Sequence, residues 1–171
     1  MRALVLHAHP LEDSFSVGVR DVVCAALDSE GVDYTLVKLA QGEEADLLTE
    51  PFEHLIAVSP TWWGGSPAVL LDWLQRTLGP YVDGSEPKHS SPLTSIQRVT
   101  VVTTHGSSQL VNSLQGEPGK QTWKRVVMPC CGADAKFEWV SLYKIDRTTE
   151  AERSAFLDRV RDHFTNDRVS V

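Results

Sequence analysis

Short runs of β-forming residues alternate with segments of helical periodicity along this chain, and that alternation limits the folds open to it. Five runs have this character: Ala3–Leu6, Tyr34–Val37, Leu55–Val58, Val99–Thr103 and Phe137–Leu142. The first four are dominated by Val, Leu, Ile and Thr, a composition typical of strands buried on both faces. Strands that alternate with helices form right-handed βαβ units. The sequence therefore predicts an α/β fold in which helices cover both faces of a parallel sheet.

Two helices are predicted from clear start and stop signals. The first carries apolar residues at helical spacing from Phe15 onward and ends at Gly31. In the second, Ser66 is the expected N-cap and Pro67 the first helical residue. The pair Gly79-Pro80 is expected to close this second helix.

Three further helical segments are expected. One covers Lys120 to Cys131 and is perturbed by Pro129, and a short one covers Glu43–Leu48. The last helix opens with Thr149 and Glu152 as a capping box. It is expected to bury four apolar side chains, namely Phe156, Leu157, Val160 and Phe164.

Length and charge exclude several classes of protein. The 171 residues are expected to form one domain, residues 1–171, and are too few for a barrel of eight βα repeats. The remaining common solution is an open three-layer sandwich. The formal net charge of −7 argues against a nucleic-acid binder, which needs a basic surface. No apolar run approaches the ~18 residues of a membrane span, and the first residues resemble a strand rather than a signal peptide. We therefore expect a cytoplasmic protein without direct membrane insertion.

Three cysteines form no disulfide framework, and we expect no metal site. Cys130 and Cys131 are adjacent, a spacing that rarely permits a bridge. They are expected to be small apolar residues at the end of a helix, and a vicinal metal-binding or redox pair is the alternative.

Ligands of open α/β sheets bind beyond the carboxyl ends of the strands, so the loops after Leu6, Val58 and Thr103 are the candidate site. The first loop leads into a helix N-terminus, where free N–H groups favour an anion. It has neither a GxGxxG nor a GxxxxGK[ST] pattern. A phosphate would instead be held by Ser14, Ser16 and His9. The alternative is that Ser14 or its neighbour Asp13 only caps the helix.

The second loop contains two adjacent tryptophans followed by two glycines. Trp62 and Trp63 are costly to expose, and Gly64-Gly65 would let a flat ligand approach the backbone closely. An aromatic heterocycle suits such a wall. The alternative is packing beneath the next helix, and we expect one of the two tryptophans to pack there.

The third loop, Thr103–Ser108, offers small and hydroxyl-bearing residues to the polar atoms of a ligand. His105 could donate a proton near neutral pH, whereas a plain turn is the alternative. Because the predicted topology brings the three loops to one edge, together they indicate one site.

Several motifs in these loops match a known family. They are His-x-x-x-x-Ser-Phe at His9–Phe15, Pro-x-Trp-Trp-Gly within Pro60–Ala68, Leu71-Asp72-Trp73 to Arg76, and Thr103-Thr104-x-Gly106. Through them the chain, from residue 1 to about 165, resembles the flavodoxin-like NAD(P)H:quinone oxidoreductases. That family includes short bacterial members and the ancillary oxidoreductases of potassium-efflux systems. The resemblance implies a flavodoxin-like three-layer sandwich with a five-stranded parallel sheet in the order 2-1-3-4-5.

The resemblance also implies a flavin held between the three loops. The first loop would bind the flavin phosphate, through His9, Ser14, Phe15 and Ser16. The second would lie along the ring system, through Pro60, Thr61, Trp62 and Trp63. The third would contact the polar edge of the ring, through Thr103, Thr104, His105 and Gly106.

The activity implied by the resemblance is that of an FMN-dependent oxidoreductase, with FAD as a possible substitute. Hydride would pass from NAD(P)H through FMN to quinones or similar electron-poor aromatics in a ping-pong cycle. His105 would be the catalytic residue, stabilising charge on the reduced ring. The resemblance further implies a homodimer in which each pocket is completed by the partner.

The chain departs from the family pattern at two positions. Ser16 stands where many relatives have Asn, and His105 stands where they commonly have Gly. The Tyr–His pair of the larger quinone reductases has no counterpart in Gln109–Asn112. Two other functions stay open, namely an electron carrier of the flavodoxin type and a flavin-binding accessory or regulatory subunit of a transporter.

Overall fold

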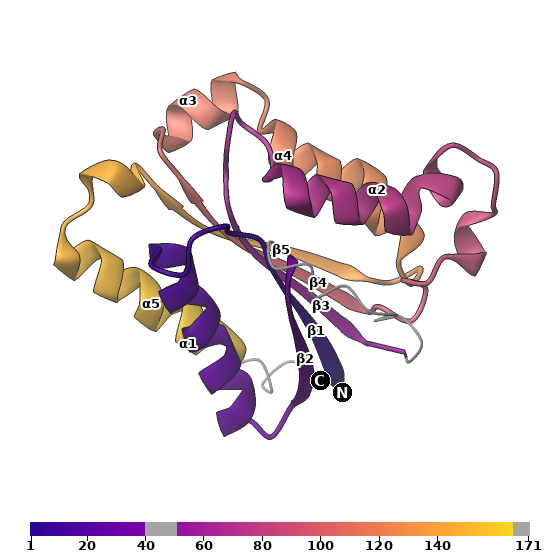
Figure 1. Cartoon of the computed structure of the whole chain (residues 1–171), viewed down its shortest axis with the longest axis horizontal. Coiled ribbons are helices and arrows are strands. Elements are labelled where there is room, and N and C mark those ends of the chain that lie inside the picture. Colours follow the sequence, from indigo (N-terminus) through magenta and orange to yellow (C-terminus); the bar gives the residue numbers. More distant parts are fainter. Residues whose placement is uncertain (40–50, 166–171) are drawn as a thin grey trace.

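The computed structural model describes residues 1–39 and 51–165, and there the alternation of the sequence becomes a sheet between two layers of helices (Figure 1). The strands are β1 (Arg2–His7), β2 (Asp33–Lys38), β3 (His54–Pro60), β4 (Arg98–His105) and β5 (Lys136–Tyr143). All neighbouring strands are parallel, and their order is β2-β1-β3-β4-β5. The five predicted strands and the predicted order are therefore confirmed.

Five helices surround the described part of the sheet: α1 (Phe15–Ser29), α2 (Ala68–Val82), α3 (Gln109–Leu114), α4 (Pro118–Thr122) and α5 (Glu150–Thr165). Figure 1 shows α1 and α5 on one face of the sheet and α2 and α4 on the other. The short α3 follows the carboxyl end of β4. The helix expected at Glu43–Leu48 lies outside the described residues.

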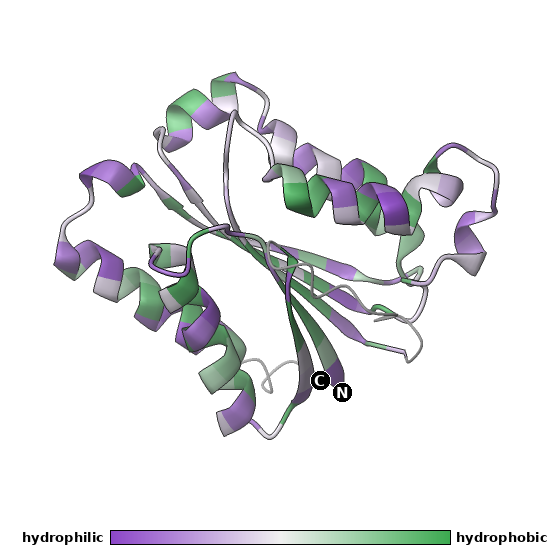
Figure 2. Cartoon of the chain, in the orientation of Figure 1, coloured by the Kyte–Doolittle hydropathy of each residue, from purple (hydrophilic) through white to green (hydrophobic). Residues whose placement is uncertain are grey.

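The strands divide their side chains between two apolar cores. On β1, Ala3 and Val5 pack with α1 and α5, whereas Leu4 and Leu6 pack with the α2 side, and all four are fully buried. Figure 2 shows the resulting hydrophobic strands in the middle of the molecule. Burial on both faces explains why these segments read as continuous apolar runs rather than alternating ones.

The capping box predicted for the last helix is present. The backbone N–H of Thr149 donates to Oε2 of Glu152 at 2.7 Å, and the N–H of Glu152 donates to Oγ1 of Thr149 at 3.2 Å. Of the four side chains expected to be buried by α5, Leu157 is only half-buried and the other three are buried.

The ends predicted for α2 are wrong by a few residues. The carbonyl of Pro67 accepts the N–H groups of Leu70 and Leu71, which makes Pro67 the N-cap in place of Ser66. At the other end the helix continues through Pro80, and the N–H of Asp83 closes the last turn on the carbonyl of Gly79. A proline this close to a helix end removes a single hydrogen bond, and the following turn can still form.

The helix predicted around Pro129 is present in its extent and is irregular as expected. After α4 the chain continues as a π-helical turn, Trp123–Val127, and a 3₁₀ turn, Met128–Cys130. Cys130 and Cys131 are buried and form no disulfide. Over residues 1–39 and 51–165, no group of three or more His, Cys, Asp or Glu side chains could hold a metal ion. In the same ranges no helix is both long and apolar enough to cross a membrane.

A network of polar side chains links β3, β4 and β5 to α5. Nε2 of His54 lies 2.8 Å from Oγ1 of Thr100, whose hydroxyl donates to Oε2 of Glu138 at 2.7 Å. The same carboxylate oxygen lies 3.1 Å from Nε2 of His163 on α5. Burial, assisted by the nearby charge of Arg98, lowers the pKa of His54 to about 3. Burial opposes ionisation of Glu138, but the hydrogen bonds from His163 and Thr100 outweigh it and hold its pKa at about 2.

Stability should fall as the pH drops from 7 to 4. In this window the unfolded chain protonates His54 near pH 6.5, while the folded chain does not until about pH 3. The effect for this residue is about 3 kcal/mol of unfolding free energy. Urea denaturation at several pH values measures this effect. Between pH 7 and pH 4 the unfolding free energy of His54→Gln should fall by about 3 kcal/mol less than that of wild type. The exposed His89→Gln variant should follow the wild-type profile, and parallel profiles for His54→Gln and wild type would contradict the assignment.

Candidate functional site

Backbone hydrogen bonds join the three predicted loops at the carboxyl edge of the sheet. The N–H of Ala8, after β1, donates to the carbonyl of Val58 at 3.0 Å. The N–H of Thr61, after β3, donates to the carbonyl of Thr104 at 2.8 Å, and the hydroxyls of Thr61 and Thr103 lie 3.0 Å apart. The loops therefore form one continuous surface, as the topology predicted.

The N-terminus of α1 is free to bind an anion. Its N-cap, Ser14, has an extended backbone, but its side chain makes no capping hydrogen bond, and the first turn contains no acidic residue. The hydroxyl oxygen of Ser14 is buried and has no hydrogen-bond partner among the described residues. The first N–H groups of a helix need acceptors, so an uncapped end next to an unpaired hydroxyl is suited to a phosphate. Ser14 occupies the N-cap position of α1 without a capping hydrogen bond from its side chain, and its role as a phosphate ligand stays a prediction.

His9 links the first loop to the second. Its ring meets the ring of Trp62 edge to face, with the ring centres 5.8 Å apart. Nδ1 of His9 lies 3.1 Å from both the backbone nitrogen and the carbonyl oxygen of Leu11, and the tautomer of the ring decides which of the two it pairs with.

The side chains of Phe15 and Ser16 lie away from the edge. Phe15 packs against Phe156 of α5, with ring centres 6.2 Å apart. Oγ of Ser16 is buried and lies 3.2 Å from Nε2 of His7, whose pKa burial lowers to about 4. What Phe15 and Ser16 can offer a ligand is their backbone N–H groups in the first turn of α1.

The two tryptophans form part of a tight hairpin, Trp62–Gly65. Trp62 and Gly65 exchange two backbone hydrogen bonds of 2.9 Å. Both central residues have positive φ, 53° at Trp63 and 81° at Gly64, the pattern of a type I′ turn. Glycine adopts this conformation freely, but a bulky residue in it is strained by about 1 kcal/mol.

Neither tryptophan packs beneath α2, so that expectation is wrong. Trp62 is 41% exposed and Trp63 is fully exposed. The reason is the contact behind the hairpin, where the N–H of Gly119 donates to the carbonyl of Gly64 at 3.0 Å. A Cβ on Gly119 would lie only 3.3 Å from that oxygen, so α4 occupies the space that a tryptophan would need. Both indole rings are exposed, and their role as a wall for a flat ligand stays a prediction.

The third loop contains a buried histidine. His105 is only 5% exposed and stacks on Tyr143 of β5, with ring centres 4.6 Å apart and 12° between the ring planes. Both of its ring nitrogens are buried without a hydrogen-bond partner. Burial lowers the pKa of His105, so at neutral pH its imidazole is uncharged and carries one N–H. It is therefore a hydrogen-bond donor rather than a source of an acidic proton.

Three residues at this edge were missed from the sequence. Tyr143 pairs with His105 in the register of β4 and β5. Asp146, in the loop after β5, reaches Gly106, where a Cβ would lie 3.0 Å from its Oδ2. Nδ2 of the buried Asn112 donates to Oγ of Ser107 at 2.8 Å and thereby holds the third loop. The rule that strand ends share one edge applies to the fifth strand too and could have predicted the first two.

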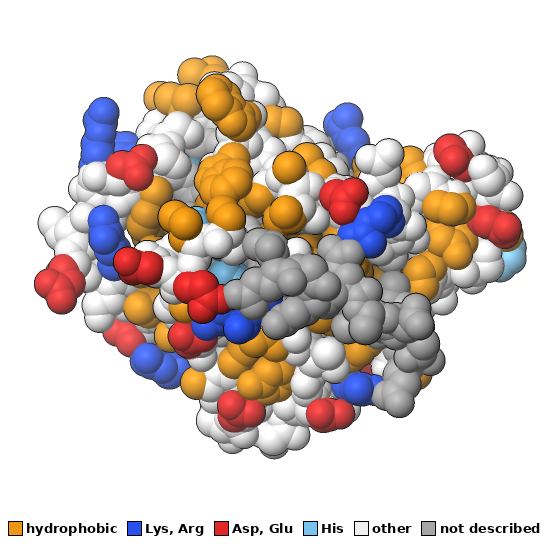
Figure 3. All heavy atoms as spheres, viewed as in Figure 1, with side chains coloured by type: hydrophobic (Ala, Val, Ile, Leu, Met, Phe, Trp, Pro, Cys, Tyr) orange, Lys and Arg blue, Asp and Glu red, His pale blue; other side chains and the backbone are white. Residues whose placement is uncertain are grey.

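Two cavities lie elsewhere on the described surface. One of about 1040 Å³ is at the amino edge of the sheet, and one of about 650 Å³ runs along β5. None of the residues that the sequence predicted as ligand contacts lines either cavity. Figure 3 shows instead exposed hydrophobic side chains over α3, beside the third loop.

Comparisons with known proteins agree with this architecture. The model of a family described as having a flavodoxin-like fold matches residues 1–164. A solved structure from Streptococcus mutans is 21% identical, with a TM-score of 0.79 over 97% of this chain and 100% of that one. An NAD(P)H:quinone oxidoreductase from Methanothermobacter marburgensis is 18% identical, with a TM-score of 0.72 over 97% and 95%. No curated protein sequence matches the chain.

A further similar structure contains a cofactor. An FMN-dependent NADH-azoreductase from Bacillus anthracis, in complex with FMN, is 11% identical to this chain. Its TM-score is 0.71 over 96% of this chain and 98% of that one. At such identities the similarity of these structures establishes the fold.

Replacing Trp63 by asparagine should stabilise the protein. Asn-Gly is the preferred pair at the centre of a type I′ turn, so Trp63→Asn would relieve about 1 kcal/mol of backbone strain. Because the indole is fully exposed, little packing is lost with it. Urea unfolding should show a higher midpoint than wild type. Leu11→Asn is a matched control, since Leu11 is also highly exposed but lies outside this turn, and it should give no gain. A lower urea midpoint for Trp63→Asn than for wild type would contradict the inference that the backbone of Trp63 is strained.

Proposed function

The chain belongs to the family with the flavodoxin-like fold, and on that premise we propose that it is an FMN-dependent NAD(P)H oxidoreductase. Its acceptors would be quinones or similar electron-poor aromatic compounds, reduced in a ping-pong cycle. The observation that carries the proposal is the uncapped N-terminus of α1, with the buried, unpaired hydroxyl of Ser14, beside the exposed tryptophan hairpin. The names of two similar structures, an NAD(P)H:quinone oxidoreductase and an azoreductase with FMN, support it by analogy of fold.

The first loop would hold the phosphate of FMN. The Ser14 hydroxyl and the N–H groups of Phe15 and Ser16 are suited to its oxygens, and the positive end of the helix dipole adds to the attraction. The imidazole of His9, which contacts the backbone of Leu11 through Nδ1, would supply a further polar group through Nε2. These groups bind an anion without any general positive charge, which suits a chain of net charge −7.

The second and third loops would hold the flavin ring. Pro60, Thr61 and the two tryptophans would lie along its plane, where exposed aromatic faces exclude water from one side. Thr103, Thr104 and Gly106 would place backbone and hydroxyl groups against its polar edge. FMN, when bound, would supply the ring that accepts and passes on the hydride.

His105 would be the catalytic donor of the site. Its imidazole is neutral and stacked on Tyr143, with the side chain of Asn112 nearby. A fixed donor in a buried position stabilises negative charge more strongly than a mobile one in water. In this role His105 contributes a hydrogen bond to the polar edge and transfers no proton.

The direct test is binding followed by turnover. Purified protein should quench the fluorescence of added FMN, and the complex should oxidise NADH or NADPH only when a quinone or an azo dye is present. Failure to bind FMN would refute the proposal. Binding without oxidation of either nucleotide would favour an electron carrier or an accessory subunit. Steady-state lines that stay parallel over a series of acceptor concentrations would support the ping-pong order.

Ser14→Ala should weaken FMN binding by about tenfold, because one hydrogen bond to a charged phosphate oxygen is lost. The fold should be unaffected, since the hydroxyl has no hydrogen-bond partner within residues 1–39 and 51–165. A fluorescence titration measures the change, and Ser85→Ala, in the exposed loop after α2, is the control. Unchanged affinity for Ser14→Ala would place the phosphate elsewhere.

We further propose that two copies of the chain pair over this edge. Leu110 and Leu114 of α3, the helix that follows the third loop, are 69% and 79% exposed. Apolar side chains gathered beside a ligand site commonly mark an interface. Sedimentation velocity should give the mass of a dimer for the wild type and of a monomer for Leu114→Glu. A monomeric wild type would refute the pairing.

A further inference from the structure

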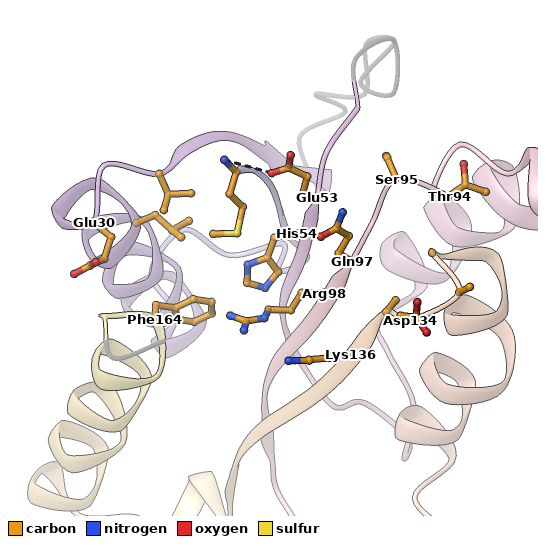
Figure 4. Close-up of a pocket in the computed structure, with 16 residues that line it drawn as sticks. Glu30, Glu53, His54, Thr94, Ser95, Gln97, Arg98, Asp134, Lys136 and Phe164 are labelled. Carbon is orange, nitrogen blue, oxygen red and sulfur yellow. Dashed lines mark ion pairs between the residues drawn. The ribbon is translucent and has the colours of Figure 1, made fainter. Parts of the chain in front are cut away.

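The outer side of β5 is an unpaired side of the sheet. Among residues 1–39 and 51–165, β5 pairs with β4 on one side and has no neighbouring strand on the other. Its first residue, Lys136, lines the large cavity at the amino edge (Figure 4). The cavity of about 650 Å³, here called the β5 groove, lies farther along the strand and is lined by Trp139, Val140, Ser141 and Tyr143. Because these residues alternate between the two faces of the sheet, the groove spans the free side of the strand.

Alternate residues of β5 direct their main-chain groups toward this free side. The N–H of Lys136 donates to the carbonyl of Gln97, the residue before β4, at 2.9 Å. The even-numbered residues of β5 therefore bond to β4, and the odd-numbered ones turn their N–H and C=O groups outward. Nη2 of Arg159 donates to one of these outward groups, the carbonyl of Ser141, at 2.7 Å. Such a row of donors and acceptors is a template for an added strand.

The sequence of β5 does little to prevent pairing with another chain. Edge strands are commonly protected by proline, a bulge or charged side chains. The segment Phe137–Tyr143 contains no proline and pairs with β4 without a bulge. Its one charged residue, Glu138, is turned to His163 of α5, with 3.1 Å between Oε2 and Nε2. β5 is therefore suited to accept a strand from a partner.

Ser141 leaves a gap between two aromatic rings. Residues 139, 141 and 143 point to the same face of the sheet, and Gln109 of α3 lines the groove beside them. A residue paired opposite Ser141 has Trp139 and Tyr143 as its diagonal neighbours, within reach of an aromatic side chain. The gap therefore favours an aromatic residue at this position of an added strand.

α5 forms the other wall of the groove and presents charges of both signs. Arg159, Asp162 and His163 line the groove. Since Arg159 contacts Ser141 and His163 contacts Glu138, α5 runs antiparallel to β5, and Asp162 lies nearer to the amino edge than Arg159 does. His163 is bonded to Glu138, whereas Arg159 and Asp162 are exposed. An added strand that runs antiparallel to β5 would meet the guanidinium first and the carboxylate second.

We propose that the β5 groove binds an extended peptide segment of a partner protein, added antiparallel to β5, with the pattern acidic–aromatic–basic. The aromatic residue lies opposite Ser141, the acid reaches Arg159 and the base reaches Asp162. A second copy of β5 does not fit this position when antiparallel, because none of its aromatic residues has an acid before it and a base after it. The site does not depend on the function proposed for the carboxyl edge.

The test uses the full chain and the synthetic peptide acetyl-Val-Glu-Phe-Lys-Val-amide. In ¹H–¹⁵N spectra the amides of residues 139, 141 and 143 should shift in a saturable manner as peptide is added. The N–H of the peptide's Phe donates to the carbonyl of Ser141, so a methyl group on that nitrogen should weaken binding at least tenfold. A methyl group on the backbone nitrogen of the Lys is the matched control. That nitrogen points away from β5, and the affinity should be kept.

Variants of α5 test the recognition of charge. Arg159→Glu should weaken the peptide about fivefold, because an exposed attraction becomes a repulsion. The peptide acetyl-Val-Lys-Phe-Lys-Val-amide should regain the lost affinity for this variant. Arg161→Glu is the matched control, since Arg161 is exposed on the same helix but lies outside the groove lining, and it should bind the first peptide as wild type does.

Four results would overturn the proposal. They are the absence of saturable binding, shifts confined to the loops after β1, β3 and β4, equal affinity of the two methylated peptides, and equal loss of affinity in Arg159→Glu and Arg161→Glu. A wild type that sediments above the mass of a dimer, with the amides of β5 protected from exchange before peptide is added, would assign the groove to a second copy instead.

Discussion

The register of the parallel strands is the constraint on which the rest of this structure depends. Hydrogen bonding of β1 between β2 and β3, and of β4 between β3 and β5, aligns all strand ends at two opposite edges. The three loops with hydroxyl, indole and imidazole groups therefore lie together at the carboxyl edge. At the amino edge His54, Arg98 and Lys136 lie side by side on neighbouring strands. A shift of the register by one residue would move every side chain of a strand to the other face of the sheet. The residues that now lie together at each edge would then be separated.

Much of the fold could be predicted because its signals are local. A strand such as Leu55–Val58 is apolar throughout because helices cover both of its faces, as is usual in parallel sheets. The capping box at Thr149 is a pattern of two residues and needs no knowledge of distant contacts. The position of the candidate site followed from the topology rule alone, which places ligands beyond the carboxyl ends of the strands.

The direction of individual side chains could not be predicted, because distant partners determine it. Ser16 turns to His7 and not to the edge, and His105 stacks on a tyrosine that lies in another strand. The tryptophans stay exposed because Gly119, far along the chain, occupies the space behind the hairpin. The sequence likewise does not indicate that His54, Arg98 and Lys136 are neighbours at the amino edge. Only the register of the strands brings them side by side.

The contact between the hairpin and α4 has a consequence for the thermodynamics of recognition. A loop that carries two exposed aromatic rings would ordinarily sample many orientations and lose that freedom when a ligand arrives. Here Trp62–Gly65 is closed by its own pair of hydrogen bonds and held from behind by the N–H of Gly119. The entropic cost of ordering this wall is therefore met during folding, and a planar ligand meets a preorganised surface.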